Sequence, residues 1–167
     1  MTVNERIEAW FAGREDEYVS ALAPLIAIDS TTGTPEPGKP FGSGPAMALD
    51  AALELARKWG LTTGEDEGYV GTVDLNDQPD QLHILAHLDV VPAGDDWTVC
   101  KPFEPVIQDG KLYGRGSIDD KGPAIAALYA MACVRSLGVP LKRNVRLILG
   151  TDEECGSGDL PHYYGKE

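Results

Sequence analysis

Three short polar motifs contain the residues that could do chemistry in this sequence. The first is LHILAHLDVVP, in which His87 and Asp89 stand two residues apart at the end of a β-like run. Because successive strand residues alternate between faces, both side chains should project on the same side of the strand. An imidazole held by a carboxylate suits a metal ligand, although a lone histidine in such a place is more often structural.

The second motif is GRGSIDDKGP, in which glycines bracket Asp119 and Asp120 where an apolar helix begins. Glycine permits positive φ and close approach of the backbone. Two adjacent carboxylates at a helix start could simply cap the helix. The flanking glycines weaken that explanation, so we keep this pair as candidate ligands.

The third motif, TDEECGSG, places Asp152, Glu153 and Glu154 directly after the β-like run RLILG. An acidic loop is usually just solvated, but sites in open α/β sheets form at the carboxyl ends of strands. If the three motifs share that edge, one pocket gathers His87, Asp89, Asp119, Asp120, Glu153 and Glu154.

Such a cluster of carboxylates needs positive charge. Two unit charges about 4 Å apart repel by about 4 kcal/mol at an effective dielectric constant of about 20. Protonation or divalent cations would relieve this repulsion. Imidazole with carboxylates and without paired thiols favours zinc, cobalt or manganese.

The segments that must position these motifs follow from local patterns. A capping box and an apolar series near helical spacing predict one long helix, or two, ending at about Ile28. Glycines and prolines then predict a surface loop over 29–44. The next helix is predicted to be capped by Ser43 and to end at Gly60.

The second half of the chain alternates strands and helices. A helix over Lys121–Leu137 is apolar almost all round, so both of its sides should be covered. The strand, helix, strand order predicts an α/β fold with a mostly parallel, doubly wound sheet and flanking helices, in one domain that spans 1–167. The predicted strands are Tyr69–Leu75, Leu82–Ala86, Phe103–Gln108 before an Asp109-Gly110 turn, and Val145–Leu149.

Composition argues against several classes of partner. The formal net charge of −13 and the pI near 4.5 disfavour nucleic acid and anionic membrane surfaces. No apolar run approaches the roughly 20 residues of a membrane span, and a signal-peptide layout is missing, so we expect a cytoplasmic protein. Three cysteines without CxxC spacing predict reduced thiols.

Taken together, the motifs HLDVVPAGDDW, PFEPVIQDGKLYGRGSIDDKGP and GTDEECGSGD resemble the zinc dipeptidases of the peptidase V type. These are grouped with carboxypeptidase G, aminoacylase and acetylornithine deacetylase. The resemblance runs from about Leu82 to the last residue. It implies hydrolysis of dipeptides by a centre of two zinc ions, for which cobalt or manganese could substitute.

The resemblance also implies a role for each site residue. His87 would bind one metal ion, Asp119 would bridge both, and Glu154 would bind the other. Asp89 would orient His87, and Glu153 would be the general base that accepts a proton and returns it to the leaving amine. In the family the peptide bond after the bridging aspartate is cis.

On this assignment each metal ion is one ligand short of three. The family draws the missing ligands from an acidic residue beyond Glu167 and from a histidine nearer the C-terminus, which His162 does not match. A separate lid domain also has no counterpart here. We therefore expect an N-terminal fragment of the catalytic domain that alone hydrolyses little or nothing.

Two alternatives stay open. One is an N-acyl amino acid deacylase of the same clan, and the other is a non-catalytic fragment that only binds metal. Assays with dipeptides and with N-acyl amino acids would separate the two enzymes. A Glu153→Ala variant would separate catalysis from mere metal binding.

Overall fold

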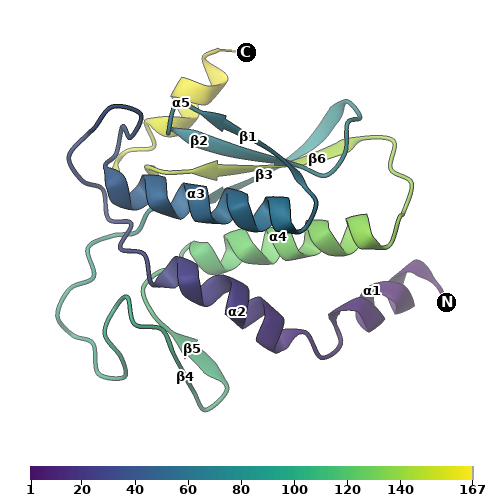
Figure 1. The fold of residues 1–167 in the computed structure, drawn as a ribbon, viewed down its shortest axis with the longest axis horizontal. Helices are drawn as coiled ribbons and strands as arrows, with labels where there is room; N and C mark the ends of the chain where they lie inside the picture. Colours follow the sequence, from purple (N-terminus) through teal and green to yellow (C-terminus); the bar gives the residue numbers. More distant parts are fainter. Residues whose placement is uncertain (167) are drawn as a thin grey trace.

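The structure is a computed structural model that describes residues 1–166, apart from the side chains of residues 80 and 81. Three helices come first along the chain, five strands follow, and α4, β6 and α5 complete it (Figure 1). The helices are α1 (Val3–Phe11), α2 (Glu15–Ile26), α3 (Ser43–Lys58), α4 (Lys121–Ser136) and α5 (Asp159–Tyr164), with a 3₁₀ turn, η1 (Glu153–Cys155). The strands are β1 (Thr62–Asp66), β2 (Val70–Asp74), β3 (Asp80–His87), β4 (Val106–Gln108), β5 (Lys111–Tyr113) and β6 (Asn144–Gly150).

The main sheet has the strand order β1-β2-β6-β3. Strands β3 and β6 are parallel and joined through α4, which confirms the predicted strand, helix, strand unit. The α/β class with flanking helices is confirmed as well. The pairs β1·β2 and β2·β6 are antiparallel, so the described sheet is mixed and the expectation of a mostly parallel sheet is corrected.

The antiparallel part arises from a hairpin that the sequence pattern did not reveal. Strand β1 reads TTGED, which lacks the apolar alternation of a half-buried strand. Its last residue pairs with Val70 across the short turn that starts at Glu67 and Gly68, both with positive φ. A connection this short can join only antiparallel neighbours.

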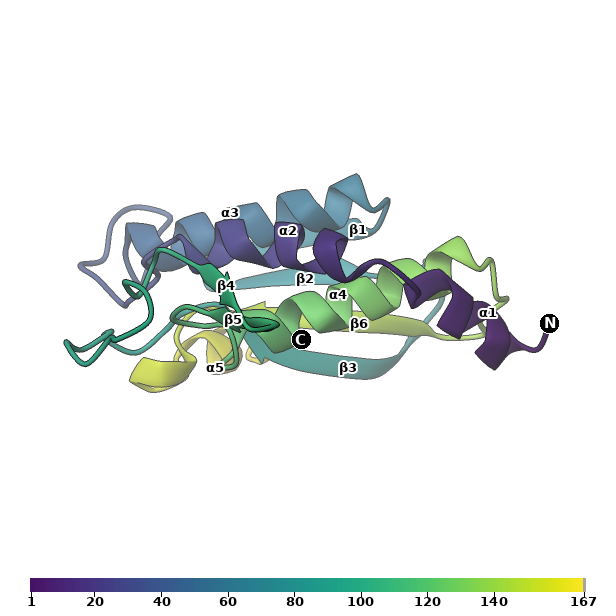
Figure 2. The same cartoon turned by 90° about the horizontal axis from the view of Figure 1, so that it is seen from below.

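The core lies between the sheet and a layer of helices. Buried residues of α2, α3 and α4 pack against inward-facing residues of β2 and β6, including Val73, Leu147 and Leu149. Figure 2 shows α3 beside β1 and β2 and α4 beside β6, with β3 at the edge of the sheet away from α3. Helix α4 contacts the sheet on one side and α2 on the other, as its apolar sequence predicts.

The predicted helix starts are right in one case and wrong in another. The capping box of α1 is present, with Glu5 N–H donating to the Thr2 hydroxyl. Ser43 does not cap α3 but is its first residue. Gly42 holds the cap position with φ 94°, and a Cβ there would collide with the backbone of Gly33.

Two features lie outside the core. The predicted strand Phe103–Gln108 shrinks to β4, which pairs only with β5 in a separate hairpin around the expected Asp109-Gly110 turn. Strand β3 is at the edge of the described sheet, and Leu82 and Leu85 are 52% and 55% exposed.

Among the described residues, no helix combines the length and apolarity that a membrane crossing requires.

Candidate metal centre

The three polar motifs meet at the carboxyl ends of the parallel strands. His87 is the last residue of β3, Asp119 lies in the loop directly before α4, and Glu154 lies in η1, which follows β6. Figure 1 shows these three segments converging at the left-hand end of the strands, where β3 and β6 finish. The parallel register pairs His87 with Gly150, so both strands end at the same level.

The side chains of this edge lie within metal-ligating distance of one another. His87 Nε2 is 3.2 Å from Asp119 Oδ1 and 3.9 Å from Glu153 Oε2. One ligand atom each from His87, Asp119 and Glu154 lies within 4.8 Å of the others. Ligand atoms about 2.0–2.2 Å from a tetrahedral ion are about 3.4 Å apart, so the separation of His87 from Asp119 fits an ion bound by both.

Asp89 lies behind the cluster and is completely buried. One carboxylate oxygen accepts the Glu153 N–H at 3.1 Å and the other accepts the Glu154 N–H at 3.0 Å. The His87 Nδ1 atom is 3.3 Å from Asp89 Oδ1 and 3.2 Å from the Asp89 carbonyl oxygen. Asp89 therefore ties η1 to β3 and orients the imidazole, while the ring atom Nε2 faces the other carboxylates.

Asp120 has a different environment from Asp119. The peptide bond between them is cis, as the family resemblance implied. Asp119 is exposed to 67% of its side-chain surface, whereas Asp120 turns back and accepts the backbone N–H of His87 at 3.1 Å. Asp120 thus fixes the end of β3 and leaves Asp119 free to face an ion.

The ionisation of the cluster reflects its excess of carboxylates. Burial of the ring would lower the pKa of His87, but the hydrogen bond and charge of Asp89, with the charges of Asp120 and Glu153, raise it to about 9. Burial, reinforced by the charge of Asp119, raises the pKa of Glu154. Without a metal ion, the site therefore takes up a proton on its histidine.

Three residues that sequence reasoning passed over support this edge. Lys121 is fully buried and donates to the carbonyl oxygens of Leu25 and Ile28, at the end of α2, at 2.8 and 2.7 Å. Asp159 accepts the N–H groups of Thr151 and Asp152. Ser30 donates its hydroxyl to the Leu88 carbonyl oxygen. All of these partners are backbone atoms, which leave no pattern in the sequence.

Other polar residues near the motifs stay outside the cluster. His83 lies further back on β3, where its Nδ1 is 3.2 Å from the Tyr164 hydroxyl. Trp97 and Arg115 both donate to the Ala93 carbonyl oxygen. The three cysteines are free thiols, as predicted.

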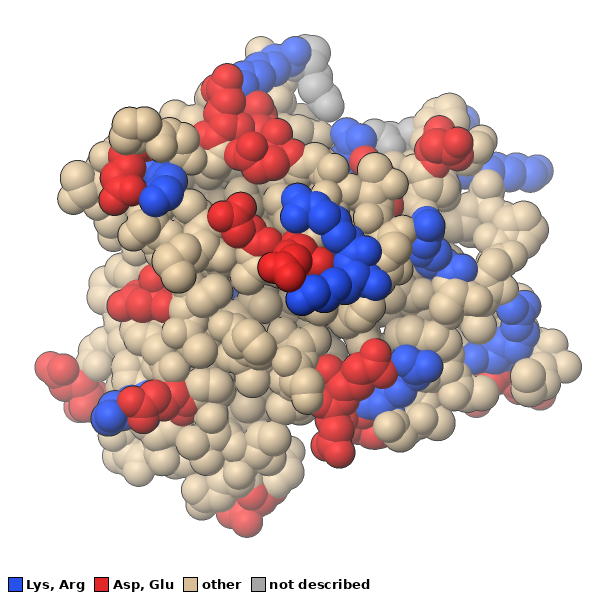
Figure 3. Space-filling model, in the orientation of Figure 1, with Lys and Arg blue, Asp and Glu red and all other residues tan. Residues whose placement is uncertain are grey.

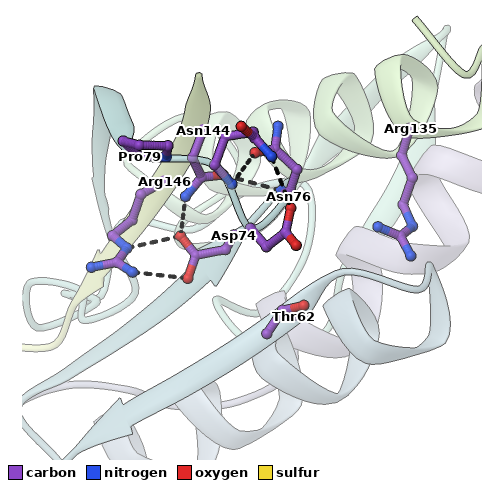
Figure 4. Close-up of a pocket in the computed structure, with 9 residues that line it drawn as sticks. Thr62, Asp74, Asn76, Pro79, Arg135, Asn144 and Arg146 are labelled. Carbon is purple, nitrogen blue, oxygen red and sulfur yellow. Dashed lines mark hydrogen bonds and ion pairs between the residues drawn. The ribbon is translucent and has the colours of Figure 1, made fainter. Parts of the chain in front are cut away.

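Two hollows lie at opposite ends of the sheet. One of about 310 Å³ adjoins the candidate metal centre and is lined by His87, Asp120 and Glu153, among others. The other, of about 760 Å³, lies where β3 and β6 begin. Figure 4 shows that polar side chains in its wall bond to one another. Arg146 donates twice to the Asp74 carboxylate, and Asn144 donates to the same carboxylate.

Comparison with known sequences points to one family. The sequence profile of the peptidase family M20/M25/M40 matches residues 83–166. The Bacillus subtilis (strain 168) protein YtjP, named as a candidate dipeptidase, is 44% identical over 156 residues, which are 92% of this chain and 34% of YtjP. A Staphylococcus aureus (strain USA300) protein that is also named as a candidate dipeptidase is 41% identical over 155 residues, which are 92% of this chain and 33% of that protein. The chain thus spans about a third of the length of these relatives.

Solved structures share the fold. Human carnosine dipeptidase 1 superposes with a TM-score of 0.82 at 29% identity, over 98% of this chain and 38% of that one. The M20 metallo-carboxypeptidase Sso-CP2 of Sulfolobus solfataricus gives 0.76 at 27% identity, over 90% and 34%. The yeast dipeptidase Dug1p gives 0.79 at 20% identity, which is a likeness of fold alone.

Proposed function

Because this chain belongs to the peptidase family M20/M25/M40, we propose that it carries the greater part of a two-metal dipeptidase centre, within the N-terminal part of a catalytic domain. The observation that carries the proposal is the convergence of His87, Asp119 and Glu154 from three separate elements to within 4.8 Å. Dipeptides are proposed as substrates because the relatives YtjP and carnosine dipeptidase 1 are named for that activity.

The donor set fits zinc-class ions. An imidazole nitrogen and carboxylate oxygens, without a thiolate, suit zinc, cobalt or manganese, and we propose zinc. His87 and Asp119 would hold one ion, and Asp119 and Glu154 the other. The exposed position of Asp119 supports its role as the bridge, because one oxygen lies near His87 Nε2 and 67% of the side chain is open to a second ion.

Two bound ions would supply Lewis-acid activation of water and of the peptide carbonyl group. Glu153 would act as the general base, taking a proton from the attacking water and passing it to the leaving amine. Its side chain is 55% exposed and reaches within 3.9 Å of His87 Nε2, so it borders the ion site without being buried behind it. Asp89 would keep the imidazole oriented.

A hybrid enzyme tests the proposal directly. In it, this chain replaces the matching segment of the B. subtilis relative, and hydrolysis of dipeptides and of N-acyl amino acids is measured with zinc present. We expect dipeptides to be cleaved faster. Glu153→Gln should lower kcat by about 10²- to 10⁴-fold while zinc affinity changes little, and the exposed Glu104→Gln control should change neither.

Three results would count against the proposal. Faster cleavage of N-acyl amino acids would make the protein a deacylase of the same clan. An active Glu153→Gln hybrid would remove Glu153 from the role of general base. A hybrid that binds zinc but cleaves neither substrate would favour a metal-binding role without catalysis.

A further inference from the structure

A second cluster of possible metal ligands lies at the same end of the sheet as the proposed catalytic centre but on other elements, between the β1–β2 turn and α5. We propose that Asp66, Glu67 and His162, here called the hairpin–α5 cluster, form an additional site for a zinc-class divalent ion. One ligand atom from each of the three lies within 4.8 Å of the others. No residue of the cluster belongs to the proposed catalytic centre.

The fold brings these residues together from distant parts of the chain. Asp66 ends β1, Glu67 begins the turn to β2, and His162 lies in α5, which follows the catalytic motif. Figure 1 shows α5 beside that end of the hairpin, and Figure 3 shows acidic side chains gathered there next to a basic one. Side chains separated by almost a hundred residues therefore face one small region.

His162 is held in a position to bind an ion. Its ring stacks on Tyr69, with centroids 3.7 Å apart and planes 8° from parallel, and Tyr69 packs edge-on against Phe41. The His162 Nε2 atom is fully buried and has no hydrogen-bond partner among the described residues. A buried polar atom without a partner is costly, which points to a ligand at this atom.

The distances around Nε2 suit coordination better than hydrogen bonding. The nearest carboxylate oxygens are Glu67 Oε2 at 3.3 Å and Asp66 Oδ2 at 3.8 Å. Good hydrogen bonds between such groups are about 2.7–2.9 Å long. Ligands about 2.0–2.2 Å from a tetrahedral ion are instead about 3.4 Å apart, close to the spacing found here.

Lys166 occupies the place of a cation in this cluster. Its Nζ atom is 2.9 Å from Asp66 Oδ1 and 3.3 Å from Glu67 Oε2. The lysine side chain is 45% exposed, so it can swing into water when a divalent ion arrives. An ion would therefore compete with Lys166, and removal of the lysine should strengthen ion binding.

The test isolates this cluster by disabling the catalytic site. The background is the whole chain with Asp119→Asn and Glu154→Gln, two substitutions outside the core. Co²⁺ is titrated in and followed by its visible d–d bands, whose intensity distinguishes four from six ligands, and by calorimetry. We expect one ion per chain in this background.

Single substitutions then identify the ligands. His162→Gln and Glu67→Gln should each weaken Co²⁺ binding by about tenfold or more, and Lys166→Met should strengthen it. Glu36→Gln, which removes a comparable carboxylate paired with Lys39, is the matched control and should leave binding unchanged.

Circular dichroism checks each variant for folding. Glu67 is 69% exposed, so its variant remains informative even if His162→Gln unfolds. Failure of the background to bind Co²⁺, or binding that survives both ligand substitutions or does not respond to Lys166→Met, would overturn the proposal. Because Asp119 and Glu154, two of the three proposed catalytic ligands, are already replaced, none of these outcomes depends on whether the chain is part of a dipeptidase.

Discussion

At the scale of single residues, Asp89 has the largest influence on the geometry of the candidate centre. Both of its oxygens are used, one for the N–H of Glu153 and one for the N–H of Glu154, and the same carboxylate adjoins His87. Hydrogen bonds to an ionised, buried carboxylate are among the stronger ones in proteins. The side chain therefore fixes two acidic residues and the imidazole at once.

Asp89→Asn should weaken both the fold and metal binding. Asparagine offers one acceptor oxygen in place of two, so one partly buried N–H loses its partner. We expect the free energy of unfolding to fall by about 1–3 kcal/mol and the zinc affinity to fall by about 10- to 100-fold, as measured by urea denaturation and calorimetry. The exposed Asp119→Asn should weaken zinc binding alone, and equal stability of the two variants would contradict this account.

The metal-free chain should lose stability as the pH rises from 6.5 to 9. The pKa of His87 is raised to about 9 in the folded state, from 6.5 for an ordinary histidine. Between these values the folded state holds more protons, so the stabilisation is present below pH 6.5 and is lost as the pH passes 9. Urea denaturation with a chelator measures it, and in His87→Asn this part of the decline should vanish. An identical profile in the variant would argue against a charged His87.

At the scale of elements, the sequence predicted the β3, α4, β6 unit well because its signals are local. The apolar series of α4 and the short apolar strands are visible without knowledge of tertiary contacts. The edge rule for open sheets then placed His87, Asp119 and Glu154 together. Strand β1 was missed because TTGED has no apolar alternation, and the anchors Lys121 and Asp159 were missed because their partners are distant backbone atoms.

Position 122, at the start of α4, should not tolerate any residue larger than glycine. A Cβ at Gly122 would overlap with the Ser117 carbonyl oxygen, and Ser117 belongs to the loop that carries Asp119. Gly122→Ala should therefore displace that loop and lower the free energy of unfolding by about 1–3 kcal/mol or more, with weaker zinc binding. Thermal denaturation and calorimetry measure both effects. Gly33→Ala, whose Cβ would have no contact nearer than 3.8 Å, is the control.

At the scale of the whole molecule, the described sheet has one covered face and, at its edge strand β3, exposed apolar side chains. Helices α2, α3 and α4 bury the inner face, whereas β3 presents its edge with two exposed leucines. An unpaired apolar edge strand is a ready template for pairing with another chain. We therefore expect this chain to self-associate through β3 when it is studied alone.

Leu85→Lys should reduce that self-association. A charged side chain on an edge strand disfavours strand pairing between molecules, and Leu85 is exposed, so the fold should be kept. Sedimentation velocity over a range of concentrations measures the effect. Ile107→Lys, at a 59% exposed position of the separate hairpin, should leave association unchanged. Equal behaviour of the two variants would exclude β3 as the contact.

The wide separation of the ligands along the chain also affects folding kinetics. His87 and Glu154 come into contact distance only after β3 and β6 have paired in parallel across α4, and pairings this far apart in sequence form slowly. A metal ion therefore finds no complete set of ligands early in folding. Zinc should accordingly leave the refolding rate almost unchanged and slow unfolding, so that the ion prolongs the lifetime of the native state without guiding the chain towards it.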